Sequence, residues 1–144
     1  MRIDTKYFGT IDIGEEKIIH FDNGLLGFED YKDYTILYDI DEEEKPFFSW
    51  LQSVDEKGLA FPVVNPLSVD EDYNPTVEDE LLNTLGDITP ENMIVLLLAT
   101  IPKDVKEASV NMRAPLVINS DNRKGMQIIV ENKEYEIKHK IIKK

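Results

Sequence analysis

Few side chains in this sequence have the type and spacing that catalysis requires. The chain has two histidines, His20 and His139, and neither lies beside a serine–aspartate pattern. No glycine-rich loop of the phosphate-binding or dinucleotide-binding kind occurs either. Because the chain has 29 Asp and Glu residues, any pair suited to general acid–base chemistry is uninformative. We therefore predict no catalytic residues and no enzymatic activity, with His20 a structural residue of a strand.

Two acidic stretches resemble the start of a calcium-binding loop, in which carboxylates alternate along the chain. They are Asp39-x-Asp41-x-Glu43 and Asp70-x-Asp72-x-Asn74. Both lack the glycine at the sixth position and the glutamate at the twelfth, so solvated loops explain them better. The absence of cysteine excludes thiolate zinc sites, disulfides and cysteine nucleophiles. The sequence predicts no metal site and no cofactor.

The same acidic residues suit binding better than catalysis. The acidic loops at 39–44 and 70–72 flank a segment rich in Phe and Trp, and Glu78, Asp79 and Glu80 follow at the start of a predicted helix. On one side of the molecule they would form an anionic rim around an aromatic floor, which suits a basic amphipathic partner. The alternative is that Phe47, Phe48 and Trp50 belong to the core, as we expect for at least two of the three.

The charge is unevenly distributed along the chain. Residues 1–80 hold 21 Asp and Glu against 6 Lys and Arg, and residues 81–144 hold 8 against 10, for a net charge of −13. Such a surface repels nucleic acid and attracts basic proteins, although negative charge also simply maintains solubility. No secretory signal is visible, and the longest apolar run, 93–99, is too short to span a membrane. We expect a soluble cytoplasmic protein.

Short apolar segments separated by turn residues organise the chain. The stretch 46–66 contains two apolar runs, 47–52 and 59–64, around a polar turn, which predicts a β-hairpin with Pro62 at an edge or bulge. Residues 93–101 predict a strand buried on both faces, and 126–130 with 135–142 predict a closing hairpin. Residues 76–85 predict the one good helix, capped by Thr76 and ended by Gly86.

Taken together, these patterns predict a mainly β fold. About ten strands at short, regular spacing and one short α-helix indicate an antiparallel β-barrel or sandwich. No repeat, linker or composition boundary divides the chain, so we expect a single domain over residues 1–144.

Three motifs resemble the FliW family of bacterial flagellar assembly factors. PFFSWLQSVDEKGLAFPVVNP at 46–66 resembles the family's aromatic-LQSVD…LAF-V-x-x-P signature. GLLGFE at 24–29 resembles its G-L-P-G-F-E segment, with Leu26 in place of proline. NMRAPLVIN at 111–119 resembles N-L-[KR]-A-P-I-V-I-N, with Met112 in place of leucine, and is followed by Arg123 and Gln127. The matches extend from Gly24 to about Val130, most of the chain.

The resemblance implies a small β-barrel regulator that is not an enzyme. Proteins similar to FliW bind CsrA, an RNA-binding translational repressor, and also bind flagellin. Free FliW antagonises CsrA non-competitively, away from its RNA surface, and so relieves repression of flagellin synthesis. Cytoplasmic flagellin captures FliW and restores repression. The resemblance therefore implies a partner switch.

The candidate binding residues follow from charge and apolarity. For CsrA we predict Asp70, Glu71, Asp72, Glu78 and Asp79, and for flagellin an apolar surface at Phe47, Phe48, Trp50 and Met112. Two other classes stay open: an acidic inhibitor that imitates nucleic acid, which RNA would displace, and a hydrolase with a carboxylate pair in the barrel mouth, which would show a deep polar cleft.

Overall fold

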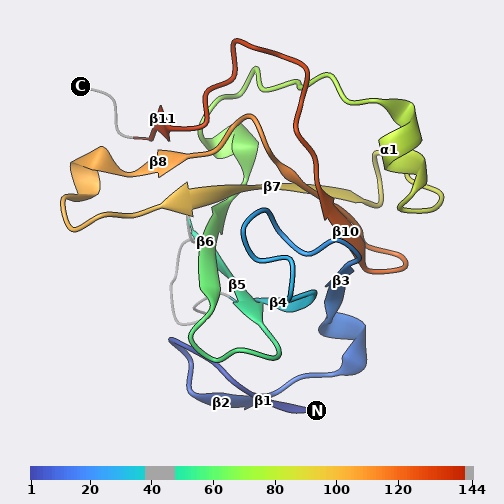
Figure 1. The fold of residues 1–144 in the computed structure, drawn as a ribbon, viewed down its shortest axis with the longest axis vertical. Helices are drawn as coiled ribbons and strands as arrows, with labels where there is room; N and C mark the ends of the chain where they lie inside the picture. The colour runs from blue at the N-terminus through green and yellow to red at the C-terminus, as the bar shows by residue number, and fades with distance from the viewer. Residues whose placement is uncertain (38–47, 142–144) are drawn as a thin grey trace.

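A computed structural model describes residues 1–37 and 48–141, with the side chain of Val105 excepted. Its elements follow one another along the chain as short strands joined by turns (Figure 1). They are β1 (Arg2–Asp4), β2 (Thr10–Asp12), η1 (Glu15–Lys17), β3 (Ile19–Phe21), β4 (Asp33–Leu37), β5 (Ser49–Ser53), β6 (Ala60–Val64), η2 (Pro66–Ser68), α1 (Asp79–Asn83), β7 (Met93–Thr100), η3 (Val105–Glu107), β8 (Ser109–Val110), β9 (Leu116–Asn119), β10 (Lys124–Gln127) and β11 (His139–Lys140).

Seven of these strands close a barrel. The pairing order runs β7-β6-β5-β4-β3-β10-β9, and β9 pairs again with β7, which closes the ring. The strands β8 and β11 extend the sheet beyond β7, and β1 and β2 form a separate hairpin. The mainly β, barrel-like fold with one short α-helix predicted from the sequence is thus confirmed for the described residues.

The barrel is antiparallel at every junction except one. Strand β10 lies parallel to β3, with Lys124 opposite His20 and Gly125 opposite Phe21. A side chain at Gly125 would not fit, because a Cβ there would lie 2.6 Å from the Phe21 ring. Glycine at this position therefore permits the close contact that joins the N-terminal and C-terminal parts of the barrel.

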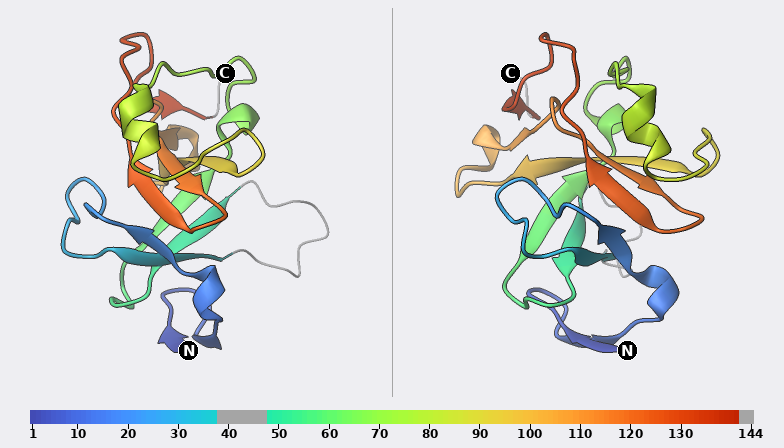
Figure 2. Two further views of the ribbon diagram at one scale, coloured as in Figure 1. Left: turned by 90° about the vertical axis from the view of Figure 1, so that its right-hand side faces the viewer. Right: turned by 45° about the vertical axis from the view of Figure 1, so that its right-hand side comes forward.

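The barrel interior is filled by residues from the 19–63 part of the chain and from β9. Its buried cluster is Ile19, Phe21, Leu25, Tyr34, Leu51, Val63, Leu116 and Ile118. Two further clusters lie outside the barrel: one joins β7 to β8 and Tyr73, and the other packs the helix region through Leu85 against Val117 and Ile128. Figure 2 shows α1 beside β9 and β10, which is consistent with that second contact.

The central hairpin forms as predicted. Strands β5 and β6 pair antiparallel, with Leu51 opposite Phe61 and Trp50 opposite Pro62. Ser53 N donates to Leu59 O (2.9 Å), so Ser53 and Leu59 form a hydrogen-bonded pair of the antiparallel ladder. Because such pairs alternate along the strands, Trp50 and Pro62 form a pair without hydrogen bonds, and the nitrogen of Pro62 points away from β5 and toward β7. Pairing of β6 with β7 begins only at Val63. Pro62 therefore lies at a ladder end rather than in a bulge, as its missing N–H requires.

Three predictions at the level of elements were wrong in detail. The helix begins at Asp79, not after a Thr76 cap, because the Thr76 carbonyl instead accepts from Glu131 N (3.3 Å) and holds that segment extended. The predicted closing hairpin does not form: β10 pairs with β9 and β3, and β11 pairs with β8. Strand β7 is not buried on both faces, since Met93 and Ile94 are exposed. The helix ends at Asn83 with Thr84 as its C-cap, and Gly86, with a φ of 87°, follows in the turn beyond it.

Candidate functional site

A groove of about 610 Å³ lies beside the first half of β7. Its walls come from η2, the segment leading to α1, the helix itself and the start of β9. The lining residues are 65–67, 73–75, 77, 82, 93–96, 115 and 117. Three apolar side chains in this lining are exposed: Leu67 (57%), Met93 (39%) and Ile94 (38%). Exposed apolar residues gathered in one groove are typical of an interaction surface.

The chain segments that supply the groove lining also contain carboxylates. The predicted residues Asp70, Glu71 and Asp72 lie between the lining residues Leu67 and Tyr73, and Glu78 and Asp79 directly follow Val77. Glu71, Asp72, Glu78 and Asp79 are exposed, and Asp70 is half-buried. Residues 58–102 contain eight Asp or Glu and no Lys, Arg or His. The five predicted acidic residues therefore lie next to lining residues in the sequence, although none of them lines the groove itself.

Tyr73 fixes the acidic loop to the barrel. Its buried hydroxyl donates to Met112 O (2.7 Å), and its ring packs against Tyr135 at 4.7 Å between centroids. The Tyr135 hydroxyl accepts from Asn74 N (2.8 Å). Burial, followed by the nearby Tyr135, raises the pKa of Tyr73 well above its usual value. These contacts hold the loop at 70–75 in one place, so that its carboxylates have defined positions relative to the groove.

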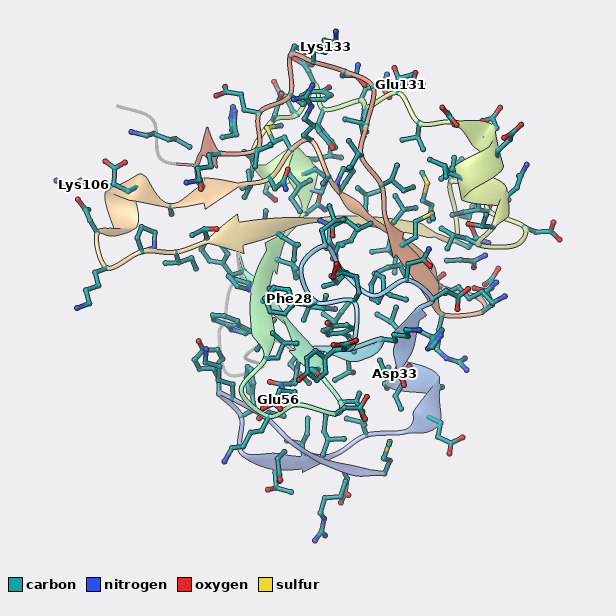
Figure 3. All side chains as sticks on the ribbon, viewed as in Figure 1. Phe28, Asp33, Glu56, Lys106, Glu131 and Lys133 are labelled. Atoms are coloured by element: carbon teal, nitrogen blue, oxygen red, sulfur yellow. The ribbon has the colours of Figure 1, made fainter. Side chains whose placement is uncertain are left out.

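The loop at 131–134 closes this end of the site. Glu131 N donates to Thr76 O (3.3 Å), and Figure 3 shows Glu131 and Lys133 on the loop that crosses beside the segment leading to α1. Lys133 adds a cation and Glu131 another carboxylate to this neighbourhood.

The predicted aromatic site is not part of the groove. Phe47 lies outside the described residues. Phe48 is half-buried against the cluster that contains Val64 and Leu97, and Trp50 is half-buried with its ring 4.4 Å from that of Tyr7. The expectation that Met112 presents apolar surface is wrong, because its side chain is only 1% exposed and packs in the same cluster.

The residues of the recognised motifs have structural roles. In the LQSVD motif, Gln52 Nε2 lies within 3.0–3.3 Å of four carbonyl oxygens of the β5–β6 turn, and its Oε1 accepts from Lys6 N (2.9 Å). In the NMRAPLVIN motif, Asn111 Oδ1 accepts from Arg113 N and Ala114 N, and Asn119 Nδ2 donates to Leu85 O (2.9 Å). These side chains satisfy backbone groups, so the motifs specify the fold rather than a contact surface.

The remaining polar clusters show no arrangement for catalysis or metal binding. His20 lies on the surface between Asp22 (Nε2–Oδ1 3.0 Å) and Asp33 (Nδ1–Oδ1 2.7 Å). In the calcium-like stretch, Asp70 Oδ1 accepts from Asp72 N (3.0 Å), which is a turn contact. The other such stretch, 39–43, lies outside the described residues. No group of three or more His, Cys, Asp or Glu in the described part of the chain is placed to hold a metal ion.

The sequence did not indicate Leu67, Met93 and Ile94, the exposed apolar residues of the groove. An apolar run such as 93–99 is typical of a buried strand, so periodicity alone could not reveal its exposed end. The available signal was Pro66, which cannot extend the β6 ladder and so implies that β6 leaves β7 at that position.

The geometry defines a closed β-barrel whose candidate site is a largely apolar groove next to acidic segments of the chain. A family model described as FliW protein matches residues 2–141. The chain is 48% identical to a flagellar assembly factor FliW of Lachnoclostridium phytofermentans, over 100% of this chain and 92% of that protein. It is 46% identical to a protein of the same name from Lachnospira eligens, over 98% and 94%.

A comparison with solved structures supports the same family. A crystal structure of a flagellar assembly factor FliW superposes with a TM-score of 0.90 at 30% identity, covering 100% of this chain and 99% of the other. This chain therefore belongs to the FliW family. Among the described residues, none of the helices has the length and apolarity that crossing a bilayer requires.

Proposed function

We propose that this protein is a cytoplasmic, non-enzymatic regulator of flagellar assembly that binds a CsrA-type translational repressor and flagellin in alternation. The observation that carries the proposal is a groove with exposed apolar residues, formed by acidic segments of the chain, on a FliW-family barrel. A basic RNA-binding protein is attracted to such a rim, and apolar contacts then slow its dissociation. Binding away from the repressor's RNA surface makes the antagonism allosteric, and flagellin capture of the free regulator restores repression.

The repressor site in this proposal consists of Asp70, Glu71, Asp72, Glu78 and Asp79. Their support is their place in the sequence, since all five lie directly beside residues that line the groove, between Leu67 and Tyr73 or just after Val77. For flagellin we propose the region of Phe47, Phe48 and Trp50, supported by the partial exposure of the last two. Met112 is excluded from this site because it is buried.

Calorimetric titration tests the partner switch. The protein is titrated with CsrA and with flagellin from the same source, and then the CsrA complex is titrated with flagellin. We expect stoichiometric binding of each and displacement of CsrA. Binding of neither partner would contradict the proposal. Displacement of CsrA from the complex by its target RNA would instead favour direct imitation of nucleic acid.

Charge reversal tests the assignment of the site. Glu71→Lys is expected to weaken CsrA binding by roughly tenfold at low salt, because a repulsive contact replaces an attractive one at the rim. Glu15→Lys, a matched reversal on η1 outside the groove, is expected to leave the affinity nearly unchanged. Equal effects of the two substitutions would mean that net charge, rather than the groove, determines binding.

A further inference from the structure

Strand β7 has one edge that is only partly paired. Ser120 N donates to Asn92 O (2.8 Å), and the register places Ile94 opposite Ile118 and Leu96 opposite Leu116. Because the main-chain groups of successive residues alternate in direction, Ile94 and Leu96 bond to β9. The N–H and C=O groups of Met93 and Val95 therefore point to the opposite edge.

On that opposite edge, β6 pairs with only two residues of β7. Val64 lies opposite Leu97 and Val63 opposite Leu98. Continuing this register would place Pro66 opposite Val95, but proline has no N–H to donate. Instead Asn65 Oδ1 accepts from Leu67 N (3.0 Å), and the chain turns away into η2. Among the described residues, no strand pairs with Met93–Leu96 on this side.

The groove runs along this open edge. Its lining includes Ile94, which lies opposite Ile118 of the barrel interior, and Leu96, which packs against the same interior cluster. The lining also includes Val95, which packs on the other face with the outer cluster around Val117. Residues from both faces of one strand line a single groove when the groove follows the strand's edge. The opposite wall of the groove, residues 73–77, is hydrogen-bonded to the 131–135 segment. Within the described part of the chain, this wall does not pair with the edge of β7.

The charge around the edge indicates what kind of segment it accepts. Residues 58–102, which provide nearly all of the lining, hold eight carboxylates and no basic residue. Natural edge strands are commonly protected by lysine, proline or a covering loop. Between Met93 and Leu96 the strand has neither lysine nor proline.

We propose that a basic partner adds an extended segment to the free edge of β7, pairing with Met93 and Val95 as an additional barrel strand. Main-chain hydrogen bonds supply the alignment, as in other cases of strand addition. Alternate side chains contact Leu67 and Ile94, and Lys or Arg residues between them face the carboxylates at 70–72 and 78–80. The inference rests on the proposed function in one respect, namely that the physiological partner is a basic protein.

The probe is a blocked heptapeptide of alternating lysine and valine, with hydrogen exchange of the backbone amides followed by NMR. We expect the peptide to slow exchange of the Met93 and Val95 amides at least tenfold, with little change at Ile94 and Leu96, whose amides already bond to β9. A peptide with glutamate in place of lysine is the charge control and is expected not to bind. No protection at Met93 and Val95 would overturn the proposal.

Two N-methylated isomers separate strand addition from side-chain binding. One isomer is methylated on its valine nitrogens and the other on its lysine nitrogens. A strand added to β7 bonds through one edge only, so one isomer should bind and the other should not. Equal binding of both isomers would show that main-chain pairing is absent and would overturn the proposal. Met93→Ser, which removes an exposed apolar contact, should weaken binding about threefold or more without loss of fold.

Failure of this inference is distinguishable from failure of the proposed function. If CsrA binds but the Met93 and Val95 amides exchange as before, strand addition is wrong and the regulator function stands. If the peptide protects the Met93 and Val95 amides but CsrA does not bind, the free edge is a binding site and the proposed partner is wrong. Sedimentation equilibrium is measured in parallel: a dimer that protects the same amides would assign the edge to a second copy of the chain and overturn the proposal.

Discussion

Gln52 shows how a single buried side chain connects three segments of this molecule. Its amide nitrogen lies among the carbonyls of the β5–β6 turn, and its amide oxygen accepts from Lys6 N in the loop between β1 and β2. The side chain is 1% exposed, so these backbone groups have little access to water. A buried amide with both ends bonded is costly to replace, because an apolar residue leaves donors and acceptors unsatisfied.

Gln52→Leu is therefore expected to lower the free energy of unfolding by about 3 kcal/mol. Urea denaturation followed by tryptophan fluorescence measures the change. Lys57→Leu, on the exposed part of the same turn, is the control and should change stability by less than about 0.5 kcal/mol. A loss from Gln52→Leu no larger than that of the control would show that the amide contacts do not contribute to stability.

Tyr34 and Tyr73 make stability depend on alkaline pH. Burial, followed by Tyr31, raises the pKa of Tyr34 to about 12, and burial also raises the pKa of Tyr73. Both hydroxyls are protonated in the folded protein at a pH where the unfolded chain, with a pKa near 10, loses its protons. The unfolded state then binds fewer protons than the native state, so stability falls as pH rises above about 10.

The slope of this fall is up to about 1.4 kcal/mol per pH unit for each tyrosine. Tyr34→Phe should reduce the slope between pH 10 and 11.5 and cost little at pH 7, because the Tyr34 hydroxyl has no hydrogen-bond partner among the described residues. Tyr7→Phe, at an exposed ring, should leave the slope unchanged. Urea midpoints measured across that pH range give both slopes, and identical slopes for Tyr34→Phe and the wild type would contradict the assignment.

At the scale of elements, the parallel junction of β3 and β10 is the most demanding contact of the barrel. Gly125 lies opposite Phe21, and no side chain fits between them. We expect Gly125→Ala to destabilise the protein by about 2 kcal/mol, since either the Phe21 ring or the strand must move. Thermal unfolding tests this, with Gly58→Ala as the control, because a Cβ at Gly58 meets only the flexible end of Glu56 at 3.7 Å. Equal transition temperatures for the two variants would exclude a steric role for Gly125.

The elements also show which parts of the structure local sequence could predict. The β5–β6 hairpin depends on neighbouring residues, and alternation with a Gly58 turn predicted it. The pairing of 126–130 was mispredicted because the partners of β10 are β9 and the distant β3, which no local pattern contains. The helix start was misplaced because a contact from Glu131 to Thr76, far apart in sequence, overrides the local capping preference.

The candidate site was predictable to a similar extent. Charge along the chain selected five carboxylates, and the groove lies between the two segments that contain them, but their role in binding stays a prediction. The apolar floor at Met93 and Ile94 was missed because its exposure results from the departure of β6 at Pro66, a feature of strand pairing rather than of the run itself. The aromatic prediction was weakest, since Met112 is buried and Trp50 packs on Tyr7.

At the scale of the whole molecule, the net charge of −13 acts on the rate of encounter with a basic partner. In stopped-flow measurements, we expect the association rate constant with CsrA to fall about tenfold between low salt, near 30 mM, and 300 mM. The double reversal Glu71→Lys with Asp72→Lys should flatten this dependence more than the reversal of Glu15 and Glu16 on η1. A salt-independent rate for the wild type would show that attraction does not guide association.

The position of β10 between β3 and β9 has a consequence for the order in which a ribosome delivers the chain. Residues opposite one another at the parallel junction are about a hundred positions apart, as His20 and Lys124 are. The N-terminal strands therefore remain unclosed until β10 has been synthesised, and closing so long a loop slows folding. A nascent chain that ends before β10 lacks the strand that pairs with β3, so binding that needs the closed barrel begins only after β10 has left the ribosome.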